Sequence, residues 1–253
     1  MTEQHPLIGQ TIQEADTPAL WIDLDAFESN AQKMLTLCNN QKVRWRPHVK
    51  ASKSPDLAHR LIEIGAQGIT CAKVAEAEAM AAGGIDDILV ANEIIGATKI
   101  GRLVEVAKQA RVGVACDDKE NISEISSIAS AANVVIDILV DINVGANRCG
   151  VTPEEAPALA RHVDESPGLR LRGLMGYEGH VMGMQPEDKE AASVSAAEVL
   201  AQAKSLVEAS GLAVDILSGG GSGNYWHAAS LGSINELQAG GGALMDISYQ
   251  ELM

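Results

Sequence analysis

A lysine ends a short basic run of the chain, in which residues 44–50 read RWRPHVK. Because side chains alternate along an extended segment, Arg46, His48 and Lys50 share one face. If this segment is the first strand of an α/β barrel, that face points inward and Lys50 lies at the strand end that carries active sites. A lysine amine can form an imine with a carbonyl compound. Lys50 is therefore our candidate catalytic residue, and we expect Arg46 to be a salt-bridged structural residue.

Two glycine runs stand where the last two strands of such a barrel would end. Glycines let the backbone approach a ligand closely and turn its N–H groups toward an anion. A phosphate site after the seventh and eighth strands recurs in this fold, so the two runs predict a phosphate-binding site. The first run comprises Ser218, Gly219, Gly220, Gly221, Ser222, Gly223 and Asn224, and the second comprises Gly240, Gly241 and Gly242.

Two further loops bring polar residues to the same predicted edge. Arg148 lies in a glycine-bounded loop that reads DINVGANRCG, and Tyr177 and His180 lie in the segment GYEGH. Tyr177 or His180 alone would be interpreted as an ordinary surface residue. Because both are predicted to lie at the same edge of the barrel as Lys50, both are candidate site residues. A lysine that faces a phosphate pocket is what an aldehyde cofactor with a phosphate handle requires. The residues alone also allow a sugar-phosphate aldolase with its own lysine imine.

The elements that must position these residues alternate along the chain. Eight short strand-like runs are separated by amphipathic helical segments, which implies parallel strands with right-handed crossovers. Eight such units favour a closed (β/α)8 barrel, and an open doubly wound sheet is the alternative. We expect strands near Val43–Val49, Gly68–Cys71, Asp87–Ala91, Arg111–Ala115, Val135–Asp141, Leu171–Tyr177, Val214–Ser218 and Glu236–Ala239. We expect helices near Ser54–Ile64, Val74–Ala82, Thr98–Ala110, Asp118–Ala131, Pro153–Asp164 and Glu187–Ser210.

Both ends of the chain depart from a bare barrel. An extra extended run, Ala19–Asp23, precedes a helix over Ala26–Cys38, and such a run needs a sheet to pair with. The last residues, DISYQELM, do not complete an element. We therefore expect an N-terminal strand segment over 1–25, a barrel over 26–245, and over 246–253 the start of a C-terminal domain that is missing.

The composition of the chain indicates which classes of binding partner are disfavoured. The chain has 253 residues, of which 46% are hydrophobic, and 34 Asp and Glu against 19 Lys and Arg give a net charge of −15. Such an acidic surface disfavours nucleic-acid and membrane partners. The N-terminus lacks the apolar stretch of a signal peptide, and the four cysteines show no zinc-site spacing. We expect reduced thiols and a cytoplasmic location.

Five motifs in order resemble the D-threonine aldolase / D-serine dehydratase family. They are RPHVK at 46–50, CAKVAEAE at 71–78, NRCGV at 147–151, SGGGSG at 218–223 and ELQAG at 236–240. The resemblance runs from about Thr17 to the end of the chain. That family consists of fold type III enzymes that depend on pyridoxal 5′-phosphate (PLP) and share the barrel of the alanine racemase N-terminal domain.

The resemblance implies a role for each candidate. Lys50 matches the lysine that carries PLP, Arg148 the arginine near its phenolic oxygen, and Tyr177 the tyrosine beside its ring. The glycine loop from Ser218 to Asn224 matches the phosphate cradle. The strand Ala19–Asp23 matches one that joins a C-terminal β domain. That domain holds the divalent metal, Mn or Zn, so we assign no metal ligand in this chain.

The resemblance also implies the reaction. We expect a lyase that acts on D-3-hydroxy amino acids as a homodimer, with aldolase cleavage to glycine and an aldehyde. A D-serine dehydratase activity and a non-catalytic PLP-binding homeostasis protein are the alternatives. The family's histidine lies six residues after the tyrosine, where this chain has Gly183, whereas His180 follows Tyr177 by three. We assign proton transfer at the β-hydroxyl to His180.

Overall fold

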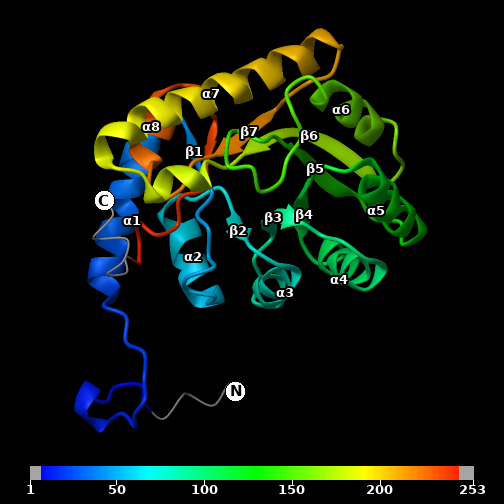
Figure 1. The fold of residues 1–253 in the computed structure, drawn as a ribbon. Helices are drawn as coiled ribbons and strands as arrows, with labels where there is room; N and C mark the ends of the chain where they lie inside the picture. The colour runs from blue at the N-terminus through cyan, green and yellow to red at the C-terminus, as the bar shows by residue number, and fades with distance from the viewer. Residues whose placement is uncertain (1–6, 245–253) are drawn as a thin grey trace.

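The fold is a closed barrel of eight parallel strands, as expected (Figure 1). The computed structural model describes residues 7–244, so the segment 246–253 lies outside the described residues. The strands lie in the order β1-β8-β7-β6-β5-β4-β3-β2. Their bounds are β1 Arg44–Trp45, β2 Ile69–Cys71, β3 Asp87–Glu93, β4 Arg111–Cys116, β5 Ile136–Asp141, β6 Leu169–Gly176, β7 Ile216–Gly219 and β8 Glu236–Leu237.

Backbone pairing beyond β1 completes the ring. The His48 N–H donates to the Gln238 carbonyl on one side, at 3.0 Å. On the other side, the Val49 N–H donates to the Thr70 carbonyl at 2.8 Å, and the Thr70 N–H donates to the Pro47 carbonyl at 2.9 Å. The segment after β1 therefore contacts both β8 and β2, and no sheet edge is left between them.

Helices surround the strands, as the ribbon view shows (Figure 1). Their bounds are α1 Leu24–Gln41, α2 Pro55–Ile64, α3 Val74–Ala82, α4 Ala97–Ala107, α5 Lys119–Ala131, α6 Ala156–Asp164, α7 Pro186–Ala209 and α8 Tyr225–Ser230. Side-chain caps start several of them: Asp23, Ser54 and Asp118 accept the backbone N–H three residues later. The sequence did not predict the short α8, which follows the first glycine run. In the described part of the chain, no helix has both the length and the apolarity of a membrane span.

The hydrophobic core has two layers. A large layer packs between the strands and the helices, and includes Trp45, Ile69 and Ile138. A smaller cluster fills the barrel and takes one side chain from each of five neighbouring strands: Leu89, Ala115, Leu139, Met175 and Ile216. The two layers follow from side-chain alternation along strands whose both faces are covered.

Arg46 is buried, shares a small cavity wall with members of the inner cluster, and is ion-paired, as expected. Its Nε lies 2.9 Å from Glu236 Oε2, and one terminal nitrogen lies 2.7 Å from Asp87 Oδ1. The Glu236 side chain is 1% exposed. This network links the segment after β1 to β8 and to β3. Because a buried carboxylate without a cation is costly, the pairing with Arg46 stabilises the fold.

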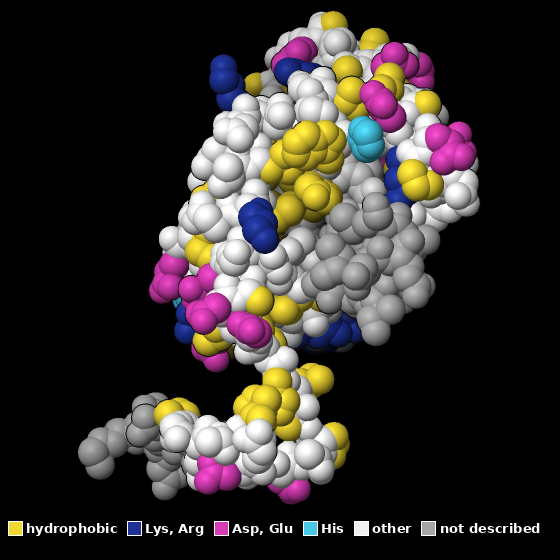
Figure 2. Space-filling view, turned by 90° about the vertical axis from the view of Figure 1, so that its left-hand side faces the viewer, with side chains coloured by type: hydrophobic (Ala, Val, Ile, Leu, Met, Phe, Trp, Pro, Cys, Tyr) yellow, Lys and Arg dark blue, Asp and Glu magenta, His cyan; other side chains and the backbone are white. Residues whose placement is uncertain are grey.

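The N-terminal arm, residues 7–23, leads away from the barrel (Figure 1). The strand expected at Ala19–Asp23 is not formed, because none of the described strands lies beside it to supply hydrogen bonds. Leu20, Trp21 and Ile22 are exposed, and hydrophobic side chains are visible along the arm (Figure 2). The expectation that this segment pairs with a C-terminal domain stays a prediction.

Removing the cation from the barrel interior tests the ion-pair network. Arg46→Met is expected to lower the free energy of unfolding by about 3–5 kcal/mol, because two carboxylates lose their partner. The matched control, Arg60→Met, breaks the exposed pair with Glu28 and is expected to cost about 0–1 kcal/mol. Urea unfolding measures both, and equal losses in the two variants would contradict a stabilising role for the network.

Candidate active site

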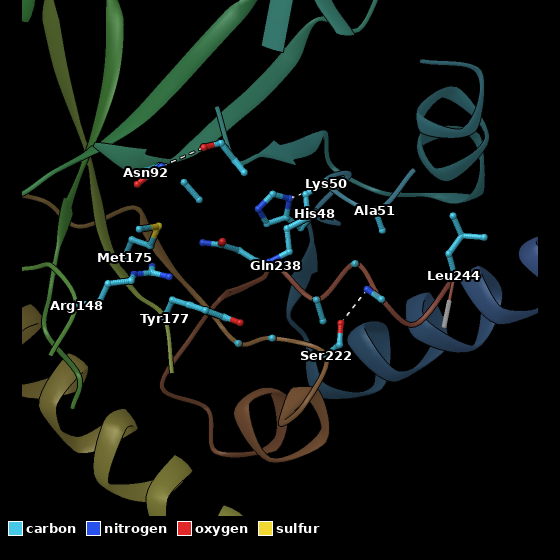
Figure 3. Close-up of a pocket in the computed structure, with 17 residues that line it drawn as sticks. His48, Lys50, Ala51, Asn92, Arg148, Met175, Tyr177, Ser222, Gln238 and Leu244 are labelled. Carbon is cyan, nitrogen blue, oxygen red and sulfur yellow. Dashed lines mark hydrogen bonds between the residues drawn. The ribbon is translucent and has the colours of Figure 1, made fainter. Parts of the chain in front are cut away.

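A cavity of about 380 Å³ opens at the carboxyl ends of the strands. Its wall consists of residues that end or follow seven of the eight strands, all but β4 (Figure 3). The lining residues are His48, Lys50, Ala51, Ala72, Ala91, Asn92, Arg148, Met175, Tyr177, Gly220, Gly221, Ser222, Gln238, Ala239, Gly240, Gly241 and Leu244. The volume suits a cofactor or another small molecule.

Lys50 reaches the cavity from the end of the segment that closes the barrel. Of the lysines in the described residues, Lys50 alone lines the cavity. His48 lies beside it and accepts a hydrogen bond from the Lys50 N–H at its Nδ1, at 3.3 Å. Burial, and then the Lys50 charge, lower the pKa of His48 to about 3, so its imidazole is neutral at physiological pH. The inward face predicted for Arg46, His48 and Lys50 is therefore observed.

The two glycine runs form one site. The Gly241 N–H donates to Ser222 Oγ at 2.8 Å, which ties the loop after β8 to the loop after β7 (Figure 3). Neither loop has room for side chains. A Cβ on Gly221 would lie 2.8 Å from Tyr177 Cε2, and one on Gly220 would lie 2.5 Å from Leu237 Cδ1. The two loops therefore form one closely packed part of the cavity wall, and phosphate binding there stays a prediction.

Several residues of the first run support the loop from behind the cavity. Ser218 is fully buried and donates to Glu236 Oε1 at 2.8 Å. Asn224 Oδ1 accepts the Gly221 N–H at 3.0 Å. Gly223 lies against Met182 with no space for a Cβ. Ser218, Gly219, Gly223 and Asn224 thus shape the loop, whereas Gly220, Gly221 and Ser222 face the cavity.

Glu178 is a support that sequence reasoning missed. Its buried Oε2 accepts the Gly220 N–H at 2.9 Å. Burial raises the pKa of Glu178, while hydrogen bonds from its own backbone N–H, from Gly220 and from Asn224 act in the opposite direction. Because Glu178 follows Tyr177 directly, one dipeptide lies beside the cavity and also fixes the glycine loop. Only the motif YEGH could have suggested it.

Arg148 and Tyr177 lie side by side on the wall. The Arg148 guanidinium carbon is 5.5 Å from the centre of the Tyr177 ring, a distance that allows a cation–π interaction. The Tyr177 side chain extends from Arg148 toward the loop that carries Ser222 (Figure 3). The structure therefore brings both predicted residues to the same cavity as Lys50.

His180 lines an adjoining cavity. Lys50, Arg148 and Tyr177 belong to the walls of both cavities, whereas His180 belongs to the wall of the adjoining one alone. Its ring lies against Gly145, where a Cβ would be 3.3 Å from His180 Nε2. Among the described residues, its buried Nδ1 has no hydrogen-bond partner.

Sequence reasoning also missed polar wall residues from β3 and β8. A register shift between Val90 and Glu93 interrupts the pairing of β3 with β4, and Asn92 in this bulge lines the cavity. Gln238 is buried and donates from Nε2 to Ser218 Oγ at 2.9 Å. The ELQAG motif contained Gln238, but nothing in the sequence signalled the bulge.

In parallel barrels of this kind, active sites form at the carboxyl ends of the strands, where this chain has a lysine and two joined glycine loops. The family model "Alanine racemase, N-terminal domain" matches residues 22–246. The chain belongs to this family, and the barrel is of the alanine racemase N-terminal type.

Relatives with assigned activities confirm the resemblance seen in the five motifs. A 3-hydroxy-D-aspartate aldolase from Paracoccus denitrificans is 40% identical over 247 residues, covering 96% of this chain and 64% of that protein. A D-threo-3-hydroxyaspartate dehydratase from Delftia sp. is 30% identical over 252 residues, again covering 96% and 64%. The crystal structure of D-threonine aldolase from Filomicrobium marinum superposes with a TM-score of 0.90 at 41% identity, covering 93% of this chain and 64% of that one. The chain thus spans 64% of the length of these relatives.

A side chain on Gly220 should displace the glycine loop at the cavity wall. Gly220 has φ +74° and no space for a Cβ, so Gly220→Ala is expected to lower the free energy of unfolding by about 1–3 kcal/mol and to weaken PLP binding. Gly101→Ala in α4 meets nothing within 4 Å and is the matched control, expected to be neutral or stabilising. Urea unfolding and absorbance titration measure the two effects, and unchanged PLP binding in Gly220→Ala would exclude this loop as the anchor.

Proposed function

We propose that this chain is the barrel of a PLP-dependent lyase that cleaves D-3-hydroxy amino acids to glycine and an aldehyde. The observation that carries the proposal is the position of Lys50, which shares one cavity with the two joined glycine loops. A lysine amine and a phosphate anchor are the two attachments that PLP needs. The family and the aldolase relatives support the same conclusion.

The cavity fits PLP by its shape and by its groups. Gly220 and Gly221 line the cavity, and neither has space for a Cβ beside its protein neighbours, so only glycine lets the backbone form this part of the wall. In the proposal, Lys50 bonds covalently to the cofactor, and the loops around Ser222 and Gly241 hold its phosphate. By the resemblance, Arg148 would be the cation near its phenolic oxygen, and Tyr177 would lie beside its ring. When bound, PLP supplies an electron sink for the α-carbon of the amino acid.

The proposed cleavage needs a base at the β-hydroxyl, and we assign His180 to that step. The hydroxyl proton goes to His180, the Cα–Cβ bond breaks, and the hydroxyl-bearing carbon becomes the aldehyde carbonyl. The α-carbon then takes a proton to give glycine. His180 suits this role because it lines one cavity together with Lys50 and Arg148, and because an imidazole ring can both accept and donate a proton.

A dehydratase is the second candidate, since one relative is named as a dehydratase of a hydroxy-D-amino acid. In that route, Lys50 takes the α-proton, hydroxide leaves, and D-serine yields pyruvate and ammonia. A PLP-binding protein without catalysis is a third candidate. Mn or Zn and the homodimer are parts of the proposal that follow from the resemblance, and the cytoplasmic location is a part that follows from the cysteine spacing. Incubation with D-threonine and D-serine, with and without each metal, and identification of the products separates the three.

The covalent attachment has a direct test. Borohydride reduction of the PLP-loaded protein is expected to fix the label on Lys50, and Lys50→Ala is expected to lose the visible absorption of the imine. Lys53→Ala is the matched control, because Lys53 lies outside the cavity wall, with its Nζ 3.7 Å from Glu76 Oε1. A label on Lys53 or Lys73 would overturn the assignment.

The proton-transfer role has a separate test. His180→Asn is expected to reduce turnover roughly 100- to 10,000-fold while PLP absorbance is retained, which is the usual contribution of a general acid or base. His162→Asn is the matched control, because His162 lies on α6 and interacts with Ser123 at 2.8 Å. A loss below about threefold would exclude His180 as the base.

A further inference from the structure

Glu178 is a buried carboxylate that the proposed mechanism does not use. The residue is 7% exposed, and none of the ion pairs among the described residues includes it. The buried Glu236, by contrast, lies 2.9 Å from the Nε of Arg46. Because burial of an unpaired carboxylate is costly, the contacts that Glu178 does make must compensate for its position.

The contact that Glu178 makes is with the first glycine loop. Its Oε2 accepts the Gly220 N–H at 2.9 Å. The next N–H, that of Gly221, is accepted by Asn224 Oδ1 at 3.0 Å. Asn224 in turn donates from Nδ2 to Ser193 Oγ on α7, at 3.3 Å. Neither Glu178 nor Asn224 lines the main cavity, so two consecutive N–H groups are directed at residues outside its wall.

Ser222, the next residue of the loop, keeps its donors for a ligand. It lines the cavity, and among the residues that the structure describes no acceptor binds its N–H. Its Oγ accepts the Gly241 N–H at 2.8 Å, and a hydroxyl that accepts can still donate. The direction of both donors depends on the turn before them, where Gly220 has φ +74° and is held by Glu178.

Tyr177, the residue before Glu178, packs on the same loop. A Cβ on Gly221 would lie 2.8 Å from Tyr177 Cε2, and one on Gly179 would lie 2.8 Å from Cε1, so the ring is in close contact with both glycines. Two successive residues thus contact two successive glycines of the loop, the ring against Gly221 and the carboxylate against Gly220. A change at Glu178 would therefore move the loop relative to the ring.

We propose that Glu178 is a positioning residue that fixes the first glycine loop in the direction that favours a ligand with a phosphate group over the same ligand without one. The inference deepens the proposed function and rests on it, since PLP is the phosphorylated ligand assigned to the cavity. A full negative charge behind the loop would oppose a phosphate. Burial acts against that charge, because it raises the pKa of Glu178. The hydrogen bond to Gly220, and not the charge, therefore carries the role.

The test compares PLP with pyridoxal, which has the aldehyde and lacks the phosphate. Absorbance titration of the full chain gives a Kd for each, and the ratio of the two measures the preference for the phosphate. Glu178→Met removes the acceptor at similar length and is expected to raise the Kd of PLP roughly tenfold, because a buried N–H loses its partner and the loop turns. The Kd of pyridoxal is expected to change by less than about twofold, because that ligand does not depend on the direction of the loop.

Two further variants separate positioning from a merely structural role. Glu178→Gln keeps an acceptor oxygen and is expected to keep the preference for the phosphate within about threefold of the wild-type value. Glu76→Met removes another buried glutamate, whose Oε2 accepts the Ala72 N–H at 2.7 Å in the segment after β2. That variant is expected to leave the preference unchanged, because Ala72 belongs to neither glycine loop.

Several outcomes would overturn the inference. Equal changes for PLP and pyridoxal in Glu178→Met would mean that the residue merely stabilises the fold. An unchanged preference in that variant, or the same loss in Glu178→Gln or in Glu76→Met, would also contradict the role of the hydrogen bond. If Glu178→Met does not fold, Glu178→Asp takes its place with the same expected loss, because its carboxylate is one methylene too short to reach Gly220.

Amide hydrogen exchange in the unaltered protein examines the same bond without a variant. The Gly220 N–H is expected to exchange at least about tenfold more slowly than the Ser222 N–H, and equal rates would contradict the bond to Glu178. Failure of the proposed function would look different: wild-type protein would bind no PLP, or the borohydride label would lie away from Lys50. A PLP-binding protein whose preference for the phosphate is insensitive to Glu178 would refute this inference alone.

Discussion

Closure of the barrel at residues 46–49 is the constraint on which the site depends. The backbone there bonds to β8 at Gln238 and to β2 at Thr70, and a buried ion pair of Arg46 with Glu236 lies directly below. These interactions fix the direction in which the chain leaves the barrel, and Lys50 is the next residue to reach the mouth. The glycine loops gain their position from the same contacts, because Gly240 lies against the His48 carbonyl with no room for a Cβ.

The sequence predicted the structure correctly where the periodicity of side chains and the spacing of elements alone determine the geometry. Alternation of side chains along residues 44–50 placed Arg46 in the interior and Lys50 at the mouth, and both positions are confirmed. Eight strand–helix units implied a closed ring, and the parallel order with the His48–Thr70 bridge agrees. Two glycine runs after the last strands were predicted to form one site, and the bond between Ser222 and Gly241 joins them, while anion binding there stays a prediction.

Features that depend on register or on long-range partners were not predictable. Asn92 lines the cavity because of a bulge in β3. A shift in the pairing of two strands leaves no recognisable pattern in a strand that mixes polar and apolar residues. Glu178 supports Gly220 across 42 residues of chain, a contact that only the folded backbone defines. The segment Ala19–Asp23 shows that a sequence pattern alone does not make a strand. Its apolar, β-favouring residues join no sheet, because the described chain offers no strand edge for them to pair with.

The bond between Ser222 and Gly241 has a consequence for biosynthesis. Lys50 emerges early from the ribosome, whereas the second glycine loop belongs to the last described residues. Because the loop after β7 is tied to the loop after β8, a nascent chain that lacks β8 has neither a closed ring nor the two joined glycine loops. Ligand capture therefore follows the folding of nearly the entire barrel, and incomplete chains are left without the stabilisation that a bound ligand gives to the native state.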